Sequence, residues 1–190
     1  DNLSTTPKDL SASPTSSPQT SLEQALATQE ADTGQVPYLS LPTIAPAVSL
    51  PTTGFPLVKA GKAIPIYIDP KGSDYDGISL AAAAFANDLM LVTDQQPEII
   101  TDKSKLEGTV MIAGSIGNNE IIDALIAEGK LDISQIKDKW ECYKIELIEK
   151  PMHGIDKAIV IAGSDKRGTI YGVFHISEMI GVSPWIYWAD

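Results

Sequence analysis

The sequence predicts an α/β fold: a small layered domain with a mixed sheet and helices packed on it, preceded by a disordered Ser/Thr/Pro-rich segment. Three observations support this prediction. Short apolar runs alternate with stretches of helical periodicity from residue 55 onward. Two of these runs, at 109–114 and 158–162, are apolar on both faces, which is typical of strands covered by helices. Third, residues 1–54 differ in composition from the rest of the chain, because they are rich in Ser, Thr and Pro.

Residues 1–54 are rich in small polar residues and proline. Of these 54 residues, 24 are Ser, Thr or Pro, and Tyr38 is the one aromatic residue. A segment of this kind buries too little apolar surface to offset the entropy lost on folding. We therefore predict a disordered linker over 1–54, with only transient helix at 21–31, and a folded domain over 55–190.

The folded part begins with a strand and a helix. The strand at 63–68 contains Pro65, which lacks an amide donor and so favours an edge position or a strand start. The helix is predicted over 77–93, because apolar residues recur there at the spacing of one helical face. That face is expected to hold Ile78, Phe85, Leu89 and Val92.

Two strands and a second helix come next. Residues 97–101 form a short strand and 109–114 a fully buried one. Asn118 is expected to cap the second helix, which continues through Ala127 and ends at Gly129.

The last part of the chain repeats the strand and helix pattern. Residues 140–149 are predicted as the longest strand, and 158–162 as another buried one. Asp165 then caps a third helix over 166–180, closed by Gly181.

Charge and composition exclude several classes of function. The net charge of −11 argues against a nucleic-acid surface, which needs clustered Lys and Arg. No apolar run approaches the ~18 to 20 residues that span a bilayer. The single cysteine, Cys142, excludes an internal disulfide and is expected to be a small core residue. His153 and His175 lie apart, so we expect no metal and no cofactor.

Two glycine turns suggest anion binding, but neither matches a phosphate loop. Gly163 and Gly168 have the right gap, yet Thr169 follows directly where the loop requires lysine, and Lys166 stands earlier. The turn at 114–117 is a bare G-x-x-G, which is expected to be a tight strand-to-helix turn.

The turn at 165–167 holds the only arginine, Arg167, beside Asp165 and Lys166. Arginine binds carboxylates through two parallel hydrogen bonds, so this turn could contact an acidic ligand or an adjacent domain. The alternative, which we prefer, is a pair with Asp165 or another local carboxylate that fixes the loop.

The carboxyl-terminal six residues, 185–190, hold two of the three tryptophans. Aromatic side chains beside a carboxylate are typical of a sugar-binding surface. An amphipathic strand packed in a core would have the same sequence pattern. Because an aromatic strand ends the chain, we expect it to be cut from something larger. Paired carboxylates for glycoside hydrolysis would have to come from Asp69, Asp74 and Asp76, which only turn propensity marks.

Longer motifs resemble the N-terminal domain of glycoside hydrolase family 115, the xylan α-1,2-glucuronidases. The resemblance covers about residues 55–190. It rests on the sequence GSDKRGTIYG at 163–172, Ser177-Glu178, IGVSPW over 180–185 and Trp188-Ala189-Asp190, and upstream on 114–117, 127–132 and 139–141.

The resemblance implies an inverting enzyme that removes (4-O-methyl)-glucuronic acid from glucuronoxylan. Its catalytic carboxylates are expected on a (β/α)₈ barrel that begins just after residue 190, so this chain is expected to be a non-catalytic accessory domain. Glucuronoxylan would bind through the barrel, the protein would be secreted or periplasmic, and the full-length protein could form a homodimer. The residues expected to face the substrate or the barrel are Asp165, Lys166, Arg167, Tyr187, Trp188 and Asp190.

Two other functions stay open. One is a stand-alone carbohydrate-binding or adhesion module on an extracellular Ser/Thr/Pro stalk, favoured by the linker and the aromatic terminus. The other is a small nucleotide-binding α/β domain, which only the topology supports.

Overall fold

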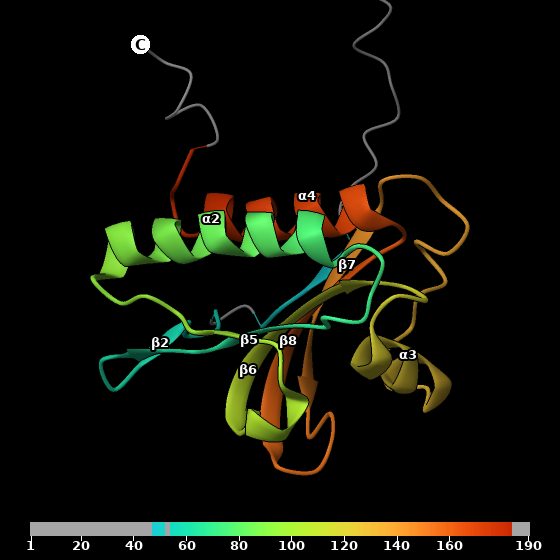
Figure 1. Ribbon diagram of the computed structural model, residues 1–190, viewed down its shortest axis with the longest axis horizontal. Helices are drawn as coiled ribbons and strands as arrows, with labels where there is room; N and C mark the ends of the chain where they lie inside the picture. The colour runs from blue at the N-terminus through green and yellow to red at the C-terminus, as the bar shows by residue number, and fades with distance from the viewer. Residues whose placement is uncertain (1–46, 52–53, 184–190) are drawn as a thin grey trace, which may run out of the picture. The chain divides into compact units, whose positions relative to one another are not determined.

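The computed structural model describes residues 47–51 and 54–183. The chain divides into two units, Asp1–Thr43 and Ile44–Asp190, and the described residues all belong to the second. In this part of the chain a mixed sheet carries three helices, so the predicted α/β class is confirmed (Figure 1). No helix among the described residues combines the length and the hydropathy needed to cross a bilayer.

Six strands form the main sheet in the order β1-β7-β8-β6-β4-β5. They are β1 (Ala47–Ser49), β4 (Ile66–Ile68), β5 (Ile99–Ile100), β6 (Gly108–Ser115), β7 (Tyr143–Glu149) and β8 (Ile155–Gly163). Strands β5, β4, β6 and β8 run parallel to one another. Strand β7 is antiparallel to β8, and β1 adds to β7 in parallel. A separate antiparallel pair joins β2 (Val58–Lys59) to β3 (Lys62–Ala63).

The helices lie on the two faces of the sheet. Helices α2 (Tyr75–Thr93) and α4 (Lys166–Met179) run side by side over one face, and α3 (Glu120–Ala127) lies on the other (Figure 1). A short 3₁₀ turn, η2 (Lys103–Lys105), precedes β6.

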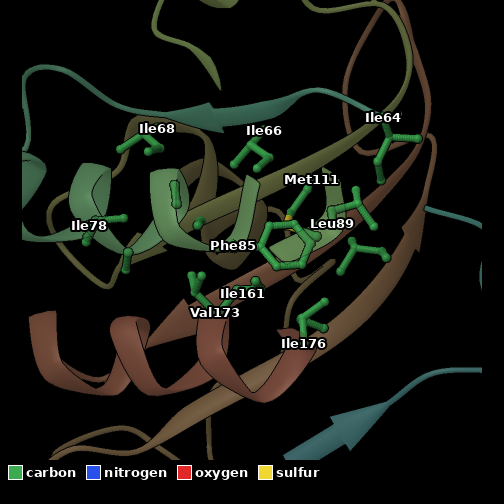
Figure 2. Close-up of a cluster of buried hydrophobic side chains, with 14 of the residues drawn as sticks. Ile64, Ile66, Ile68, Ile78, Phe85, Leu89, Met111, Ile161, Val173 and Ile176 are labelled. Carbon is green, nitrogen blue, oxygen red and sulfur yellow. The ribbon is translucent and has the colours of Figure 1, made fainter. Parts of the chain in front are cut away.

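Each face of the sheet packs its own apolar core, because successive side chains of a strand point to opposite sides. In β4, Ile66 and Ile68 face α2 and α4, whereas Tyr67 faces the α3 side. Figure 2 shows Phe85 and Leu89 of α2 in the first core, among isoleucines from the sheet. Strands β6 and β8 supply side chains to both cores, as their continuous apolar sequences predicted.

The sheet extends further upstream than composition suggested. Strand β1 pairs with β7 from Ala47↔Lys144 to Ser49↔Glu146, although these residues lie within the predicted linker 1–54. Pro65 is not at a sheet edge, because β4 lies between β6 and β5. It stands just before β4, where its carbonyl accepts from the Met111 amide, so its other predicted role, a strand start, is the correct one.

Two further predictions need correction. The strand predicted over 140–149 begins only at Tyr143, and β8 is longer. Trp140 lies outside it and is 85% exposed. In α2, Ile78, Phe85 and Leu89 are buried as predicted, but Val92 is exposed. The buried stripe is instead completed by Ala81, Ala82 and Ala86, whose small side chains let the helix lie close to its neighbours.

Candidate functional site

The polar residues singled out in the sequence gather at one edge of the sheet. Strands β4, β6 and β8 are parallel, so their carboxyl ends meet at the same edge. Asp69 follows β4, Ser115 ends β6 and Asp165 lies just beyond β8. The antiparallel strand β7 begins at this edge, since Tyr143 pairs with Gly163.

The middle of this edge is a topological switch point. From β4 the chain passes through α2 on one face to β5, and from β6 it passes through α3 on the other face. Open α/β sheets bind ligands in the crevice that such a divergence leaves. An open hollow of about 460 Å³ lies here. It is lined by Asp69, Lys71, Gly72, Gly117, Asn118, Asn119, Glu120 and Asp123.

The carboxylates of Asp69 and Asp123 accept hydrogen bonds from backbone amides around the hollow. Asp69 accepts from the amides of Lys71 and Glu120, each at 2.9 Å. Asp123 accepts from the Gly117 amide at 2.8 Å. Asp69 thus satisfies the first amide of α3, where a helix attracts negative charge, and Asp123 satisfies an amide of the turn that precedes it.

Asp74, the second carboxylate considered for hydrolysis, is also engaged. It accepts from the Ser115 hydroxyl and, at 3.3 Å, from the Asn118 side-chain amide. These bonds tie the loop after β4 to the loop after β6. The two loops therefore brace each other, and their carboxylates act as structural acceptors.

Helix α3 is capped by Asn119, one residue later than predicted. The Asn119 side-chain oxygen accepts from the amides of Ile121 and Ile122, each at 3.1 Å. Its amide nitrogen donates to the Ala113 carbonyl at 3.3 Å. Asn118 instead accepts from the Ser73 hydroxyl at 2.7 Å. The tight turn expected at 114–117 is present, with Gly117 at φ 79°.

The glycines near the start of α4 bring that helix against the sheet. Gly168 lies within the helix and faces the backbone of Cys142, where even one Cβ atom would collide. Thr169 is buried, and its hydroxyl donates to the Asp165 carbonyl at 3.1 Å. These positions pack backbone against backbone. Cys142 is buried, as predicted.

Asp165 caps α4, as predicted. One carboxylate oxygen accepts from the Gly168 amide and the other from the Glu141 amide, each at 2.8 Å. Beside it, the Ser164 amide donates to the Cys142 carbonyl at 2.8 Å. The start of α4 is therefore fastened to the segment that enters β7.

Arg167 forms the local ion pair that the sequence favoured, but its partner is Glu141. The guanidinium lies 2.8 Å from the Glu141 carboxylate and donates to the Tyr171 hydroxyl at 2.9 Å. Its centre also lies 5.9 Å from the centroid of the Tyr171 ring. The hydrogen bond with Tyr171, followed by the charge of Glu141, raises the pKa of Arg167. The pair is open to solvent, so its effect on stability is small.

The remaining predicted site residues have different outcomes. Lys166 is exposed at the first position of α4, beside Arg167. Tyr187, Trp188 and Asp190 lie outside the described residues. The structure therefore brings together Asp165, Lys166 and Arg167 only.

Sequence reasoning missed the partner of Arg167 and the role of Asn119. Glu141 lies 26 positions before Arg167, and no local pattern joins them. Asn119 stands beside a second asparagine of equal capping preference, so propensity alone does not choose between them. Among the described residues, no group of three or more His, Cys, Asp or Glu side chains could hold a metal ion.

Comparison with known proteins links this fold to one enzyme family. No protein-family model and no curated protein matches the chain. Among solved structures, the chain is similar to a family GH115 4-O-methyl-α-glucuronidase with specificity for decorated arabinogalactans. The match has 28% identity and a TM-score of 0.54, and it covers 70% of this chain and 15% of that enzyme. The chain therefore contains a domain related to part of a GH115 glucuronidase.

Proposed function

We propose that this chain is the N-terminal accessory domain of a glycoside hydrolase that releases (4-O-methyl)-glucuronic acid from glucuronoxylan by an inverting mechanism. The observation that carries the proposal is the likeness to a GH115 glucuronidase, which shares 28% of its residues over 70% of this chain. The sequence motifs at 163–172 and 180–185, which resemble the same family, also support it. The parent protein acts on polysaccharide outside the cytoplasm, either secreted or in the periplasm.

The accessory role is supported by what the carboxylates do. An inverting glycosidase needs a general acid and a general base on opposite sides of the bond, about 6.5 to 9.5 Å apart. Asp69, Asp74 and Asp165 instead accept hydrogen bonds that hold loops and cap α4. Because these groups maintain the fold, the reacting carboxylates come from a following (β/α)₈ barrel, whose own loops build its active site.

The proposed contact with the barrel includes residues at the start of α4. Arg167 is exposed and held by Glu141 and Tyr171, so its guanidinium is oriented before any partner arrives. Lys166 is exposed beside it. Tyr187, Trp188 and Asp190 complete the proposed contact from the segment that leads into the barrel.

The proposal specifies the acidic sugar that is released more closely than the polymer that carries it. The similar enzyme is specific for decorated arabinogalactans, and its name gives the leaving sugar as 4-O-methyl-glucuronic acid. Glucuronoxylan carries the same sugar. The test therefore offers both polymers.

The decisive experiment compares this chain with its parent open reading frame. The parent is expected to encode a barrel after residue 190 and to release 4-O-methyl-glucuronic acid from glucuronoxylan, measured by anion-exchange chromatography. The 190-residue chain should release none and show no binding to the polymer by calorimetry. Release only from arabinogalactan would correct the substrate, and a parent without release from either polymer would overturn the proposal.

Binding by the isolated chain would point to a different function. Micromolar affinity of the 190 residues for glucuronoxylan is the behaviour of a stand-alone carbohydrate-binding module. A shift of the melting temperature by ATP or a dinucleotide would instead indicate a nucleotide site.

A further inference from the structure

Helix α2 is apolar on the side that faces away from the sheet as well as on the side that faces it. Phe85 and Leu89 point inward and are buried. On the outward side, Leu80 is 74% exposed and Leu91 is 68% exposed. Of the two charged residues in this helix of 19, Asp88 is buried, so Asp76 is the one exposed charge. Asn87, seven residues after Leu80, adds one exposed amide, so this side is mainly rather than wholly apolar. Large apolar side chains gathered on one outward side mark a surface that is normally covered.

Helix α4 continues the same surface. Tyr171 and Phe174, three residues apart, are exposed on its outward side. Helices α2 and α4 run side by side (Figure 1). Their outward residues therefore lie on the same side of the domain. The outer face is defined here by Leu80, Ala83, Asn87 and Leu91 of α2 and by Tyr171, Phe174 and Glu178 of α4, all of them exposed.

Most of the exposed large hydrophobic side chains among the described residues lie on the two helices that carry the outer face. Among the described residues, nine large hydrophobic side chains are exposed, and seven of them lie on α2 and α4. They are Leu80, Met90, Leu91, Val92, Tyr171, Phe174 and Met179. Concentration of this kind, as opposed to scattered single residues, marks an interaction surface.

We propose that the outer face is the surface on which the domain following residue 190 of the parent polypeptide docks. The inference rests on the proposed function for the existence of that domain. It adds which surface of the accessory domain the enzyme covers. The α2 and α4 pair is then the middle layer of a larger structure, with the sheet on one side and the next domain on the other.

The exit of the chain favours a tethered partner. Helix α4 ends at Met179, and the Val182 amide donates back to the Ser177 carbonyl at 3.0 Å across Gly181. The polypeptide therefore leaves from the helix layer itself. A domain joined a few residues beyond this end is held near the helix layer, at a high effective concentration. The sequence of the exit continues with Trp185, Ile186, Tyr187 and Trp188.

The size of the outer face also favours a tethered domain over a second copy of this chain. Helix α2 has 19 residues, so it is about 28 Å long at 1.5 Å per residue. Two packed helices are about 20 Å wide, so the face is on the order of 550 Å², or about 1,100 Å² counted on both partners. Inter-domain interfaces bury about 600 to 1,500 Å². Obligate dimers commonly bury about 2,000 Å² or more.

The rim of the outer face includes Arg167, one of the residues that the sequence predicted to face the barrel. Arg167 donates to the hydroxyl of Tyr171, so the arginine predicted to face the barrel lies at the edge of the outer face. An apolar centre with a polar, charged rim is the usual anatomy of a protein interface. The partner surface should therefore be mainly apolar, with a carboxylate or other acceptor opposite Arg167 and hydrogen-bond donors opposite Asn87 and Glu178.

Carbene footprinting of side chains, read by mass spectrometry, tests the proposal on two proteins. In the 190-residue chain, Leu80, Leu91, Tyr171 and Phe174 should be labelled at all protein concentrations. In the parent polypeptide, the same residues should be labelled at least about fivefold less, because the docked domain excludes the reagent. Peptides from α3 should be labelled equally in both proteins.

Equal labelling of the outer face in the two proteins would overturn the proposal. Protection that appears in the 190-residue chain as its concentration rises would show that a second copy is the occupant, and it would also overturn the proposal. Glucuronic acid release is assayed on the same parent preparation. Release without protection contradicts the docking surface alone, and protection without release contradicts the proposed function alone.

A matched pair of substitutions provides a second measurement. Ala83 of α2 and Ala124 of α3 are both exposed helical alanines. In the 190-residue chain, Ala83→Lys and Ala124→Lys should each shift the melting temperature by less than about 2 °C. In the parent, Ala83→Lys should lower it by about 4 °C or more, and Ala124→Lys should not. Equal effects of the two in the parent would contradict docking on this face.

Discussion

The two faces of the sheet are covered by helices of different character. Helix α3 is amphipathic: Ile121, Ile122 and Leu125 are buried, and its exposed positions are charged or alanine. Helix α2 is equally apolar toward the sheet, but it also exposes Leu80 and Leu91. Helix α3 therefore exposes no large apolar side chain, whereas α2 and α4 together expose seven.

The difference shows that burial toward the sheet and the chemistry of the outward surface are set independently. Both helix layers complete a hydrophobic core, so both contribute to folding. A concentration of large apolar side chains on the outward side is what distinguishes the α2 and α4 layer from α3. Matched pairs of substitutions test this comparison. Some pairs place one change on each side of the sheet, and others compare two positions on the same side.

The largest effect is expected from truncating one buried leucine on each side. Leu89 of α2 and Leu125 of α3 are both almost fully buried. Leu89→Ala and Leu125→Ala should each lower the free energy of unfolding by about 3 kcal/mol, because each leaves a cavity in a packed core. Urea denaturation measures both values. If Leu89→Ala cost much less than Leu125→Ala, the two cores would not be equivalent.

A somewhat smaller effect should separate two glycines on the α2 and α4 side. Gly168 faces the Cys142 backbone, so Gly168→Ala should destabilise the domain by about 2 kcal/mol or more. Gly77 of α2 faces the flexible side chain of Lys166, whose nearest atom lies 2.9 Å from the place that an added methyl group would take. Gly77→Ala should therefore be neutral or stabilise by up to about 1 kcal/mol. Thermal unfolding of both variants measures the difference, and a harmless Gly168→Ala would contradict the close approach of α4.

On the α3 side, two adjacent asparagines should differ. Asn119 is buried and caps α3, so Asn119→Ala should cost about 1 to 2 kcal/mol. The side chain of Asn118 bonds mainly to the loop after β4, and Asn118→Ala should cost less than about 0.5 kcal/mol. Equilibrium denaturation of the two variants decides between the two capping positions, since the reverse order would place the cap at Asn118.

The smallest effect concerns alkaline stability on the α3 side. Burial, followed by the charge of Asp69, raises the pKa of Tyr67 to about 12. The folded state thus holds the phenolic proton more tightly than the unfolded state, whose pKa is near 10. The stabilisation is complete below pH 10 and is lost as the pH rises from 10 to 12. In Tyr67→Phe the unfolding free energy should fall less steeply over this interval, and an unchanged slope would contradict the assignment.

Much of the fold could be predicted from local patterns. The helical period over 77–93 and the continuous apolar runs at 109–114 and 158–162 locate α2, β6 and β8, because burial on one or both faces imposes these patterns directly. The cap at Asp165 was also predictable, since an acceptor side chain before a helix satisfies free amides. Strand β1 was not, because three residues in a Ser/Thr/Pro-rich segment become a strand only by pairing with β7.

The candidate site was predicted only in part. The turn at 165–167 was singled out by its residues, but the partner of Arg167 depends on β7 starting beside the end of β8. The hollow at the switch point depends on strand order, which brings the loop after Asp69 beside the turn at 114–117. Neither relation can be predicted from residues that are close together in the sequence.

The sequence by itself determined the α/β class, the main helices and central strands, and the family resemblance. Each of these follows from periodicity or from residues that are adjacent in the chain. Only the tertiary structure decided that β4 lies inside the sheet, that Glu141 pairs with Arg167, and that Leu80, Leu91, Tyr171 and Phe174 are exposed on two neighbouring helices. The physical reason is that strand order and helix placement are set by packing between distant segments, and packing also decides which apolar residues stay uncovered.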